Sequence, residues 1–186
     1  MVKLNRIYTR TGDMGSAGLV DGSRLSKSSL RMVAIGEVDE ANAAIGVALA
    51  AVGDDELSNM LLAVQNDLFD LGADVATPGE SDGALRIVPS QVERLERQID
   101  AMNANLTPLT SFILPSGSAA VAGLHFARTV VRRAERAAVA LNEVERLNPA
   151  MLAYLNRLSD HLFVAARMLA AAAGGDVLWK PGNTRD

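Results

Sequence analysis

Apolar side chains recur every three or four residues along most of the chain beyond residue 28, which is the spacing of an amphipathic helix. The clearest case is a run of six aliphatic side chains at Leu57, Leu61, Val64, Leu68, Leu71 and Val75. No alternation of apolar and polar residues is long enough to predict a strand of useful length. The pattern therefore predicts an all-α protein.

Capping and helix-breaking residues divide this pattern into five segments. We expect helices at about 29–52, 54–76, 89–106, 116–144 and 149–173. Asp54 or Asp55 can cap the second helix, and Asn148 can cap the fifth. Ser90 and Glu93 have the spacing of a capping box for the third. Five helices with short connections favour an antiparallel five-helix bundle.

The N-terminal segment has a different composition. Residues 8–27 are rich in Gly, Ser and Thr and have no helical periodicity, so we expect an ordered loop there. The length of 186 residues suits one domain, 1–186. We divide it into a loop segment 1–27, a helical bundle 28–175 and a C-terminal tail 176–186.

Composition excludes several kinds of site. The chain has no cysteine, which rules out disulfide scaffolds, zinc–thiolate sites and cysteine nucleophiles, and it has only two histidines. No apolar run reaches the ~18 residues needed to span a bilayer. The first residues also lack the apolar core of a signal peptide. We therefore expect a cytoplasmic protein that does not contact membranes.

Charge is distributed unevenly. The net charge of −4 argues against a nucleic-acid partner. However, residues 1–31 contain six basic side chains against two acidic ones, and residues 128–136 contain four arginines against one glutamate. Two basic islands in an acidic chain indicate a local anion site, with solvated surface as the alternative.

The expected fourth helix places several ionisable side chains on one arc. At 100° per residue, that arc contains His125, Arg128, Arg132, Glu135 and Arg136. Arg133 lies further round. Charged residues on one side of a helix are often only its solvated face. All four basic residues here are arginines, however, and arginine binds phosphate oxygens through two parallel hydrogen bonds.

The N-terminal loop is a second candidate for binding phosphate. Its glycines and threonine hydroxyls, with Lys27 nearby, can surround an anion, although the loop lacks the Gly-Lys-Ser/Thr sequence of a P-loop. On the fifth helix, Asn156 is a poor helix former and suggests a hydrogen-bonding role. Acidic residues Glu37, Asp39 and Glu40 on the first helix could orient an arginine of the fourth.

These stretches together resemble the PduO-type ATP:cob(I)alamin adenosyltransferases. The matching blocks are IYTRTGD at 7–13, GEVDEANA at 36–43, FILPSG at 112–117, RRAER at 132–136, YLNRLSD at 154–160 and LWKPG at 178–182. The blocks occur in family order over almost the whole chain. The resemblance implies a homotrimeric five-helix bundle with active sites between neighbouring subunits.

The resemblance also implies an activity and a site. Such enzymes transfer the 5′-deoxyadenosyl group of ATP, bound with Mg²⁺, to the cobalt of cob(I)alamin and release triphosphate. A reductase and an adenosylcobalamin-dependent enzyme would be partners. The residues that map to ATP binding are Thr9, Arg10, Thr11, Gly12, Ser16, Ala17, Lys27, Arg132, Arg133, Glu135, Arg136 and Asn156.

The corrin side of the site maps to other residues. Phe112 would lie against the lower face of the corrin ring, with His125 also contacting cobalamin. A salt bridge between the first and fourth helices maps to Asp39 and Arg128. We expect Arg132, Asp39, Arg128 and Phe112 to be the catalytic residues. The chain departs from the family at Met14, where a lysine is usual.

Two other function classes remain open from the residues alone. A regulatory nucleotide-binding protein would use the same phosphate-binding groups without needing an apolar corrin face. A purely structural helical oligomer would bind no ATP.

Overall fold

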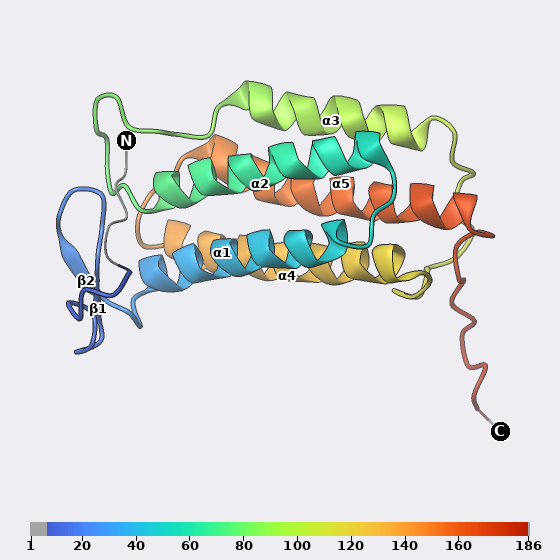
Figure 1. Cartoon of the computed structure of the whole chain (residues 1–186), viewed down its shortest axis with the longest axis horizontal. Helices are drawn as coiled ribbons and strands as arrows, with labels where there is room; N and C mark the ends of the chain where they lie inside the picture. The colour runs from blue at the N-terminus through green and yellow to red at the C-terminus, as the bar shows by residue number, and fades with distance from the viewer. Residues whose placement is uncertain (1–6, 186) are drawn as a thin grey trace.

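The computed structural model describes residues 7–185, so residues 1–6 of the expected loop segment and residue 186 of the tail lie outside the described part. Five helices and a short hairpin form the fold (Figure 1). The hairpin pairs β1 (Ser16–Gly18) with β2 (Arg24–Ser26) in antiparallel register. The helices are α1 (Leu30–Leu49), α2 (Asp55–Val75), α3 (Pro89–Asn103), α4 (Ala119–Asn142) and α5 (Pro149–Ala172). The predicted all-α bundle is confirmed, and the hairpin is an addition to it.

The helices alternate in direction along the chain (Figure 1). α1 packs against α2 and α4, and α5 packs against α4 and α3. The α1–α2, α1–α4 and α4–α5 pairs are antiparallel, whereas α3 and α5 run in the same direction. The connection at 104–118 therefore crosses the end of the bundle near the C-terminal tail.

Aliphatic and small side chains form the core. All six aliphatic residues predicted on α2 are at most 1% exposed. α1 and α4 approach each other closely, because a Cβ atom at Gly123 would lie 3.0 Å from the Cα of Ala48. Tyr154 is also buried, and its hydroxyl donates to Asp67 Oδ2 at 2.6 Å. Burial and this carboxylate raise the pKa of Tyr154 well above its ordinary value.

The helix ends agree in part with the expected capping residues. Asp54 Oδ1 accepts from the Leu57 backbone at 2.8 Å, and Asn148 Oδ1 accepts from the Ala150 backbone at 3.1 Å. The capping box predicted from Ser90 and Glu93 is wrong, because Ser90 already lies inside α3. The cap of this helix is Val88, whose backbone N–H donates to Gln91 Oε1 at 3.0 Å.

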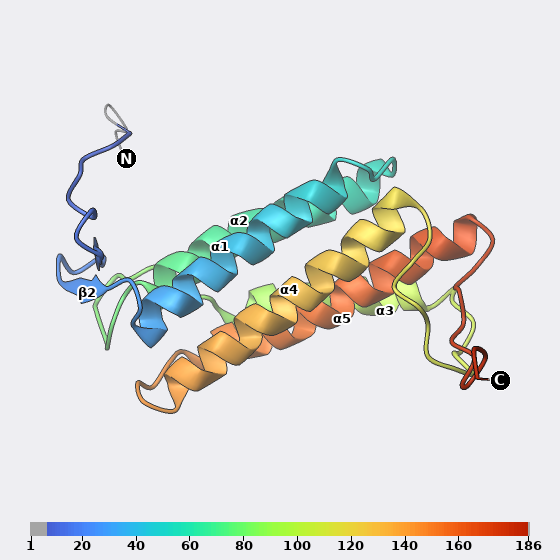
Figure 2. The same ribbon diagram turned by 90° about the horizontal axis from the view of Figure 1, so that it is seen from below.

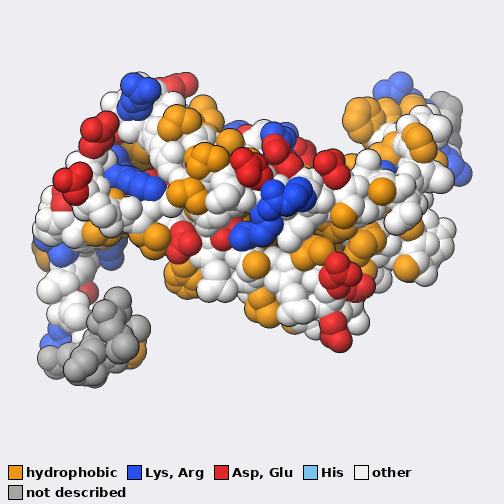
Figure 3. All heavy atoms as spheres, turned by 90° about the horizontal axis from the view of Figure 1, so that it is seen from above, with side chains coloured by type: hydrophobic (Ala, Val, Ile, Leu, Met, Phe, Trp, Pro, Cys, Tyr) orange, Lys and Arg blue, Asp and Glu red, His pale blue; other side chains and the backbone are white. Residues whose placement is uncertain are grey.

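Charge on the α3 face is mixed. Acidic and basic side chains lie side by side there (Figure 3), and Arg157 of α5 pairs with Glu96 of α3 at 2.9 Å. None of the helices within residues 7–185 combines the length and apolar character required to cross a membrane.

Candidate functional site

A hollow of about 830 Å³ opens where α4 and α5 meet the connection before α4 and the C-terminal tail. Aromatic and basic side chains line it together. The lining residues are Leu109, Thr110, Ser111, Phe112, Ile113, Pro115, His125, Arg128, Arg132, Phe163 and Trp179. Four of the expected site residues therefore share one cavity: Phe112, His125, Arg128 and Arg132.

Backbone pairing holds the aromatic side of this hollow. Leu114 N donates to Val177 O at 2.7 Å, and Trp179 N donates to Phe112 O at 2.8 Å. The rings of Phe112 and Trp179 lie 6.1 Å apart with their planes tilted by 58°. Phe112 is 78% exposed, so it is not a core residue. We call this pair of rings the aromatic wall.

The opposite side of the hollow contains buried polar atoms. Within residues 7–185, His125 Nδ1 and Arg128 Nε have no hydrogen-bond partner. Burial lowers the pKa of His125, Arg128 lowers it further and Asp176 opposes the change. Burial and then Arg132 lower the pKa of Arg128. Buried polar atoms without partners are costly unless a ligand satisfies them.

The arginines of the RRAER motif at 132–136 on α4 lie in different environments. Arg132 is exposed and lines the hollow. Arg133 turns towards α1, where it forms ion pairs with Glu37 and Glu40 that raise its pKa. Arg136 Nη1 donates to Arg132 O at 3.0 Å. The motif thus presents some guanidinium groups to solvent and uses Arg133 to join two helices.

Two further predicted residues meet beside this motif. Asn156 Nδ2 of α5 donates to Glu135 Oε1 of α4 at 2.8 Å. Asp39 lies exposed on α1 and forms no ion pair with Arg128 within residues 7–185. The α1–α4 ion pairs of the described chain are those of Arg133. The sequence analysis expected Asp39 to pair with Arg128, whereas within one copy Glu37 and Glu40 pair with Arg133.

The N-terminal loop is a separate polar cluster. Thr9 Oγ1 and Thr11 Oγ1 lie 2.9 Å apart. A Cβ at Gly12 would lie 3.3 Å from both Lys27 Nζ and Ser16 O, so glycine there allows these groups to approach. Arg10 has a positive φ of 62° and places its guanidinium 5.6 Å from the Tyr8 ring. Ala17 pairs with Leu25 in the hairpin.

Arg24 organises this loop, and the sequence pattern did not single it out. Its Nη2 donates to Thr11 O at 2.7 Å and to Ser16 O at 3.0 Å. A guanidinium that accepts no bond and donates several is well suited to joining loop carbonyls. The only advance signal was its place among the basic residues of segment 1–31.

The two clusters lie at opposite ends of the molecule. The hairpin and N-terminal loop lie beyond one end of the bundle, and the tail lies beyond the other (Figures 1 and 2). α4 has 24 residues and is therefore about 36 Å long. Lys27 and the aromatic wall of one chain consequently cannot contact the same small group.

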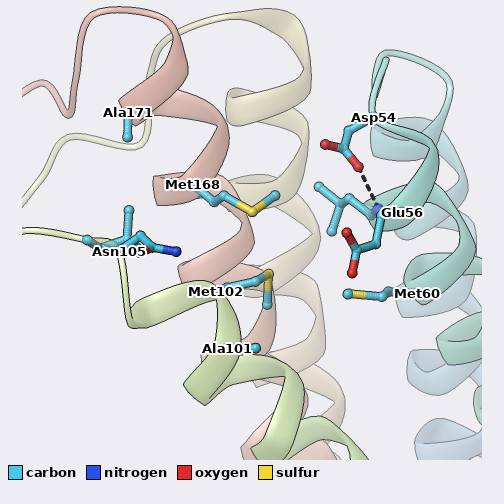
Figure 4. A pocket seen from close by; sticks show the side chains of 10 residues that line it. Asp54, Glu56, Met60, Ala101, Met102, Asn105, Met168 and Ala171 are labelled. Atoms are coloured by element: carbon cyan, nitrogen blue, oxygen red, sulfur yellow. Dashed lines mark hydrogen bonds between the residues drawn. The ribbon is translucent and has the colours of Figure 1, made fainter.

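Two other hollows suit a polyphosphate less well. One of about 310 Å³ is lined by Met60, Met102, Met168 and other apolar residues (Figure 4), and its ionisable lining residues are Asp54 and Glu56. Both acids would repel an anion. Another of about 670 Å³ contains Arg31 and Arg86, which already bind Glu145 and Asp74.

Comparison with known proteins gives consistent matches. The family model described as cobalamin adenosyltransferase matches residues 7–169. The corrinoid adenosyltransferase of Mycobacterium tuberculosis is 52% identical, over 99% of this chain and 97% of its own. The corrinoid adenosyltransferase of Bacillus subtilis is 46% identical, over 92% and 91%.

Solved structures agree with these matches. A variant PduO-type ATP:corrinoid adenosyltransferase from Lactobacillus reuteri, complexed with cobalamin and ATP, superposes with a TM-score of 0.90. It is 35% identical, and the match covers 95% of this chain and 97% of that one.

Proposed function

Because the chain belongs to the cobalamin adenosyltransferase family, we propose that its aromatic-walled hollow binds the corrin ring of the substrate. As a corrinoid adenosyltransferase, the protein transfers the 5′-deoxyadenosyl group of ATP to the cobalt of cob(I)alamin and releases triphosphate. This activity excludes the regulatory and purely structural alternatives. We assign its steps to residues of the hollow, of α4 and of the N-terminal loop.

A single observation carries the corrin assignment. Phe112 is 78% exposed beside Trp179, and it faces a hollow that also contains buried atoms of His125 and Arg128 without a hydrogen-bond partner among residues 7–185. A corrin is a broad apolar disc with polar amide side chains at its rim. Such a ligand covers exposed aromatic rings and supplies partners to buried polar groups at the same time.

The nucleotide assignment rests on two sets of charges. Arg132 and Arg136 present guanidinium groups along one stretch of α4, and Glu135 is held by Asn156 beside them. Lys27, with Thr9, Thr11 and Gly12, offers a second anion-binding cluster. We assign the first set, with Arg133, and the N-terminal loop, including Arg10, Ser16 and Ala17, to ATP.

The N-terminal loop and the aromatic-walled hollow lie at opposite ends of one chain, so they can serve one reaction only if different copies supply them. The proposed assembly is a homotrimer in which the N-terminal loop of one copy meets the α4 arginines and hollow of its neighbour. Exposed apolar side chains of α1 and α4 provide a surface for such contact: Val33, Val47, Phe126 and Val139. Across the same interface, we assign the Asp39–Arg128 salt bridge to two copies.

The reaction needs no nucleophile from the protein. The electron pair on Co(I) forms the new bond to C5′, and the pair of the breaking C5′–O bond leaves with triphosphate. Arg132 stabilises the negative charge that develops on the leaving group. Phe112 excludes water and a lower ligand from cobalt, which favours reduction to the nucleophilic state. The protein contributes positioning and charge stabilisation.

Mg²⁺ enters this proposal with the nucleotide. Within residues 7–185, no three carboxylate or imidazole side chains gather as a metal-binding group. Mg²⁺ in nucleotide sites commonly keeps several waters and binds phosphate oxygens with one or two carboxylates. Glu135, fixed by Asn156, is the carboxylate that we assign to this role.

The cellular setting follows from the chemistry. Co(I) must be generated by a reductase and the product must pass to an adenosylcobalamin-dependent enzyme, so we propose both as partners in the cytoplasm. The decisive test is an anaerobic assay with cob(I)alamin and MgATP, followed by the absorption spectrum of adenosylcobalamin. Formation of that spectrum with release of triphosphate supports the assignment, and its absence with folded protein contradicts it.

A further inference from the structure

One buried arginine joins the two segments that carry the aromatic wall. Arg167, in the last turns of α5, is only 7% exposed. Its Nε donates to Asp176 Oδ2 at 3.0 Å in the C-terminal tail. Its Nη2 donates to Thr107 O at 2.8 Å in the connection before α4. The two contacts use different nitrogens of the same planar group.

Together with the contacts of the aromatic wall, these two hydrogen bonds link the connection before α4 to the C-terminal tail at two points. Thr107 lies five residues before Phe112, and Asp176 lies three residues before Trp179. The two segments meet again beyond these points, where Trp179 N donates to Phe112 O and Ser111 Oγ donates to Trp179 O at 2.9 Å. We call this closed set of contacts the tail clasp. Arg167 is its point of attachment to the helical bundle.

Apolar packing does little to position the same segments. The hollow of about 310 Å³ lies against Asn105 and Leu106, immediately before Thr107 (Figure 4). Residues 107–110 are exposed, and so are Phe112 and Trp179. Since surface loops with few buried contacts open easily, the polar contacts of the clasp must fix the wall.

We propose that Arg167 is a positioning residue for the aromatic wall, acting through Asp176 and Thr107 rather than through contact with substrate. Lysine cannot replace it, because an ammonium group lacks the planar fork that reaches both acceptors at once. The negative charge of Asp176 also acts on His125 in the hollow, because it opposes the lowering of the His125 pKa. The effect of the clasp on corrin binding rests on the proposed function, whereas the clasp itself does not.

Trp179 allows a direct test without any substrate. It is the only tryptophan of the chain, so intrinsic fluorescence reports on the tail clasp alone. Arg167→Lys should shift the emission to longer wavelength. Acrylamide quenching should rise by up to about twofold, because Trp179 is 44% exposed in the clasp and complete exposure sets the upper limit. Arg157→Lys is the matched control, since Arg157 also joins α5 to another element but lies about three turns away.

Asp176→Ala is the second variant, and it should give the same fluorescence change. Residue 176 lies outside every helix, so this variant carries the test even where Arg167→Lys fails to fold. Helix content from circular dichroism should match the parent in both. Unchanged quenching in the folded variants overturns the proposal, and so does an equal rise in Arg157→Lys.

The functional consequence is measured with cob(II)alamin and MgATP. Loss of the clasp should lower the fraction of four-coordinate cob(II)alamin roughly tenfold, the factor that one charge-assisted hydrogen bond supplies. MgATP affinity should stay within about twofold, because Arg167 touches neither nucleotide cluster. Parallel loss of both ligands would contradict a positioning role. Parent protein that binds no corrinoid would refute the proposed function and leave the fluorescence result standing.

Discussion

The two ends of the bundle present different kinds of groups to a ligand. At the hairpin end, hydroxyls, backbone groups and cations surround a loop that Arg24 organises. At the tail end, two exposed aromatic rings face a hollow whose buried nitrogens find no hydrogen-bond partner in the described part of the chain. The first arrangement suits a flexible polyanion, and the second suits a rigid disc. Since the two arrangements lie about a helix length apart, the proposed meeting of the two substrates requires more than one copy of the chain.

The largest effect should come from breaking the tail end alone. Phe112→Ala removes the aromatic face proposed to contact the corrin, and truncation of such a central contact costs ~3 kcal/mol, so adenosylation starting from cob(II)alamin should fall about 100-fold. MgATP affinity should remain within about twofold of the parent. The melting temperature should change little, because Phe112 is largely exposed. Paramagnetic resonance of cob(II)alamin measures the loss of the four-coordinate form; a large fall in melting temperature with loss of both ligands would instead make Phe112 structural.

Next in size is the loss of an α4 cation. Arg132→Ala should reduce turnover about 10- to 150-fold, since a charge-assisted contact contributes roughly 1.5–3 kcal/mol. Steady-state kinetics with MgATP measure this change, and most of it should appear in kcat because the charge on triphosphate grows in the transition state. Arg97→Ala on the α3 face is the control, since Arg97 has only a 4.0 Å surface pair with Glu93. Unchanged kinetics would remove Arg132 from the site.

Mixing two defective chains tests whether the ends belong to different copies. Lys27→Ala and Phe112→Ala should each be impaired, the former about tenfold for one lost phosphate contact. After refolding together at equal amounts, about a quarter of the sites should combine an intact loop with an intact hollow. Activity should therefore exceed the sum of the two separate chains. Strictly additive activity would place both ends of the site in one copy. As a separate measurement of the proposed trimer, light scattering should report three chains per particle.

The smallest expected effect concerns Met14, which is 96% exposed in the loop. Met14→Lys adds a cation beside the proposed triphosphate site, and exposed charges contribute at most about 1 kcal/mol. We expect MgATP to bind about two- to threefold more tightly by calorimetry, with the gain lost at high salt. Unchanged binding would show that residue 14 faces away from the nucleotide.

Sequence reasoning succeeded where the physical cause was local and repeated. The helix α2 was predictable because its six aliphatic residues recur at alternating steps of four and three, and all six are buried. The hairpin was missed because three-residue strands show no alternation and depend on hydrogen bonds from Arg24. The role of Val88 as a cap was equally invisible, since its own side chain accepts no bond.

The site shows the same division. Helical geometry placed His125 with the α4 arginines, and the structure brings His125, Arg128 and Arg132 to one hollow. The contacts of Arg167 could not be foreseen, because its partners lie in two irregular segments at sequence distances of 60 and 9 residues. The proposed pairing of Asp39 with Arg128 of another copy could not be derived from one chain, in which this carboxylate is exposed.

The close approach of Gly123 to Ala48 also affects which segments of the molecule can bend. Ala48 lies in the last turn of α1 and Gly123 near the start of α4, so this close contact holds the tail-side ends of the two helices together. We therefore expect bending in the attached segments rather than at this crossing. Backbone amides near Ala48 and Leu124 should exchange with deuterium only through global unfolding. Amides of the hairpin and tail should exchange far sooner. The two ends proposed to bind the substrates can therefore rearrange while the helices between them keep their packing.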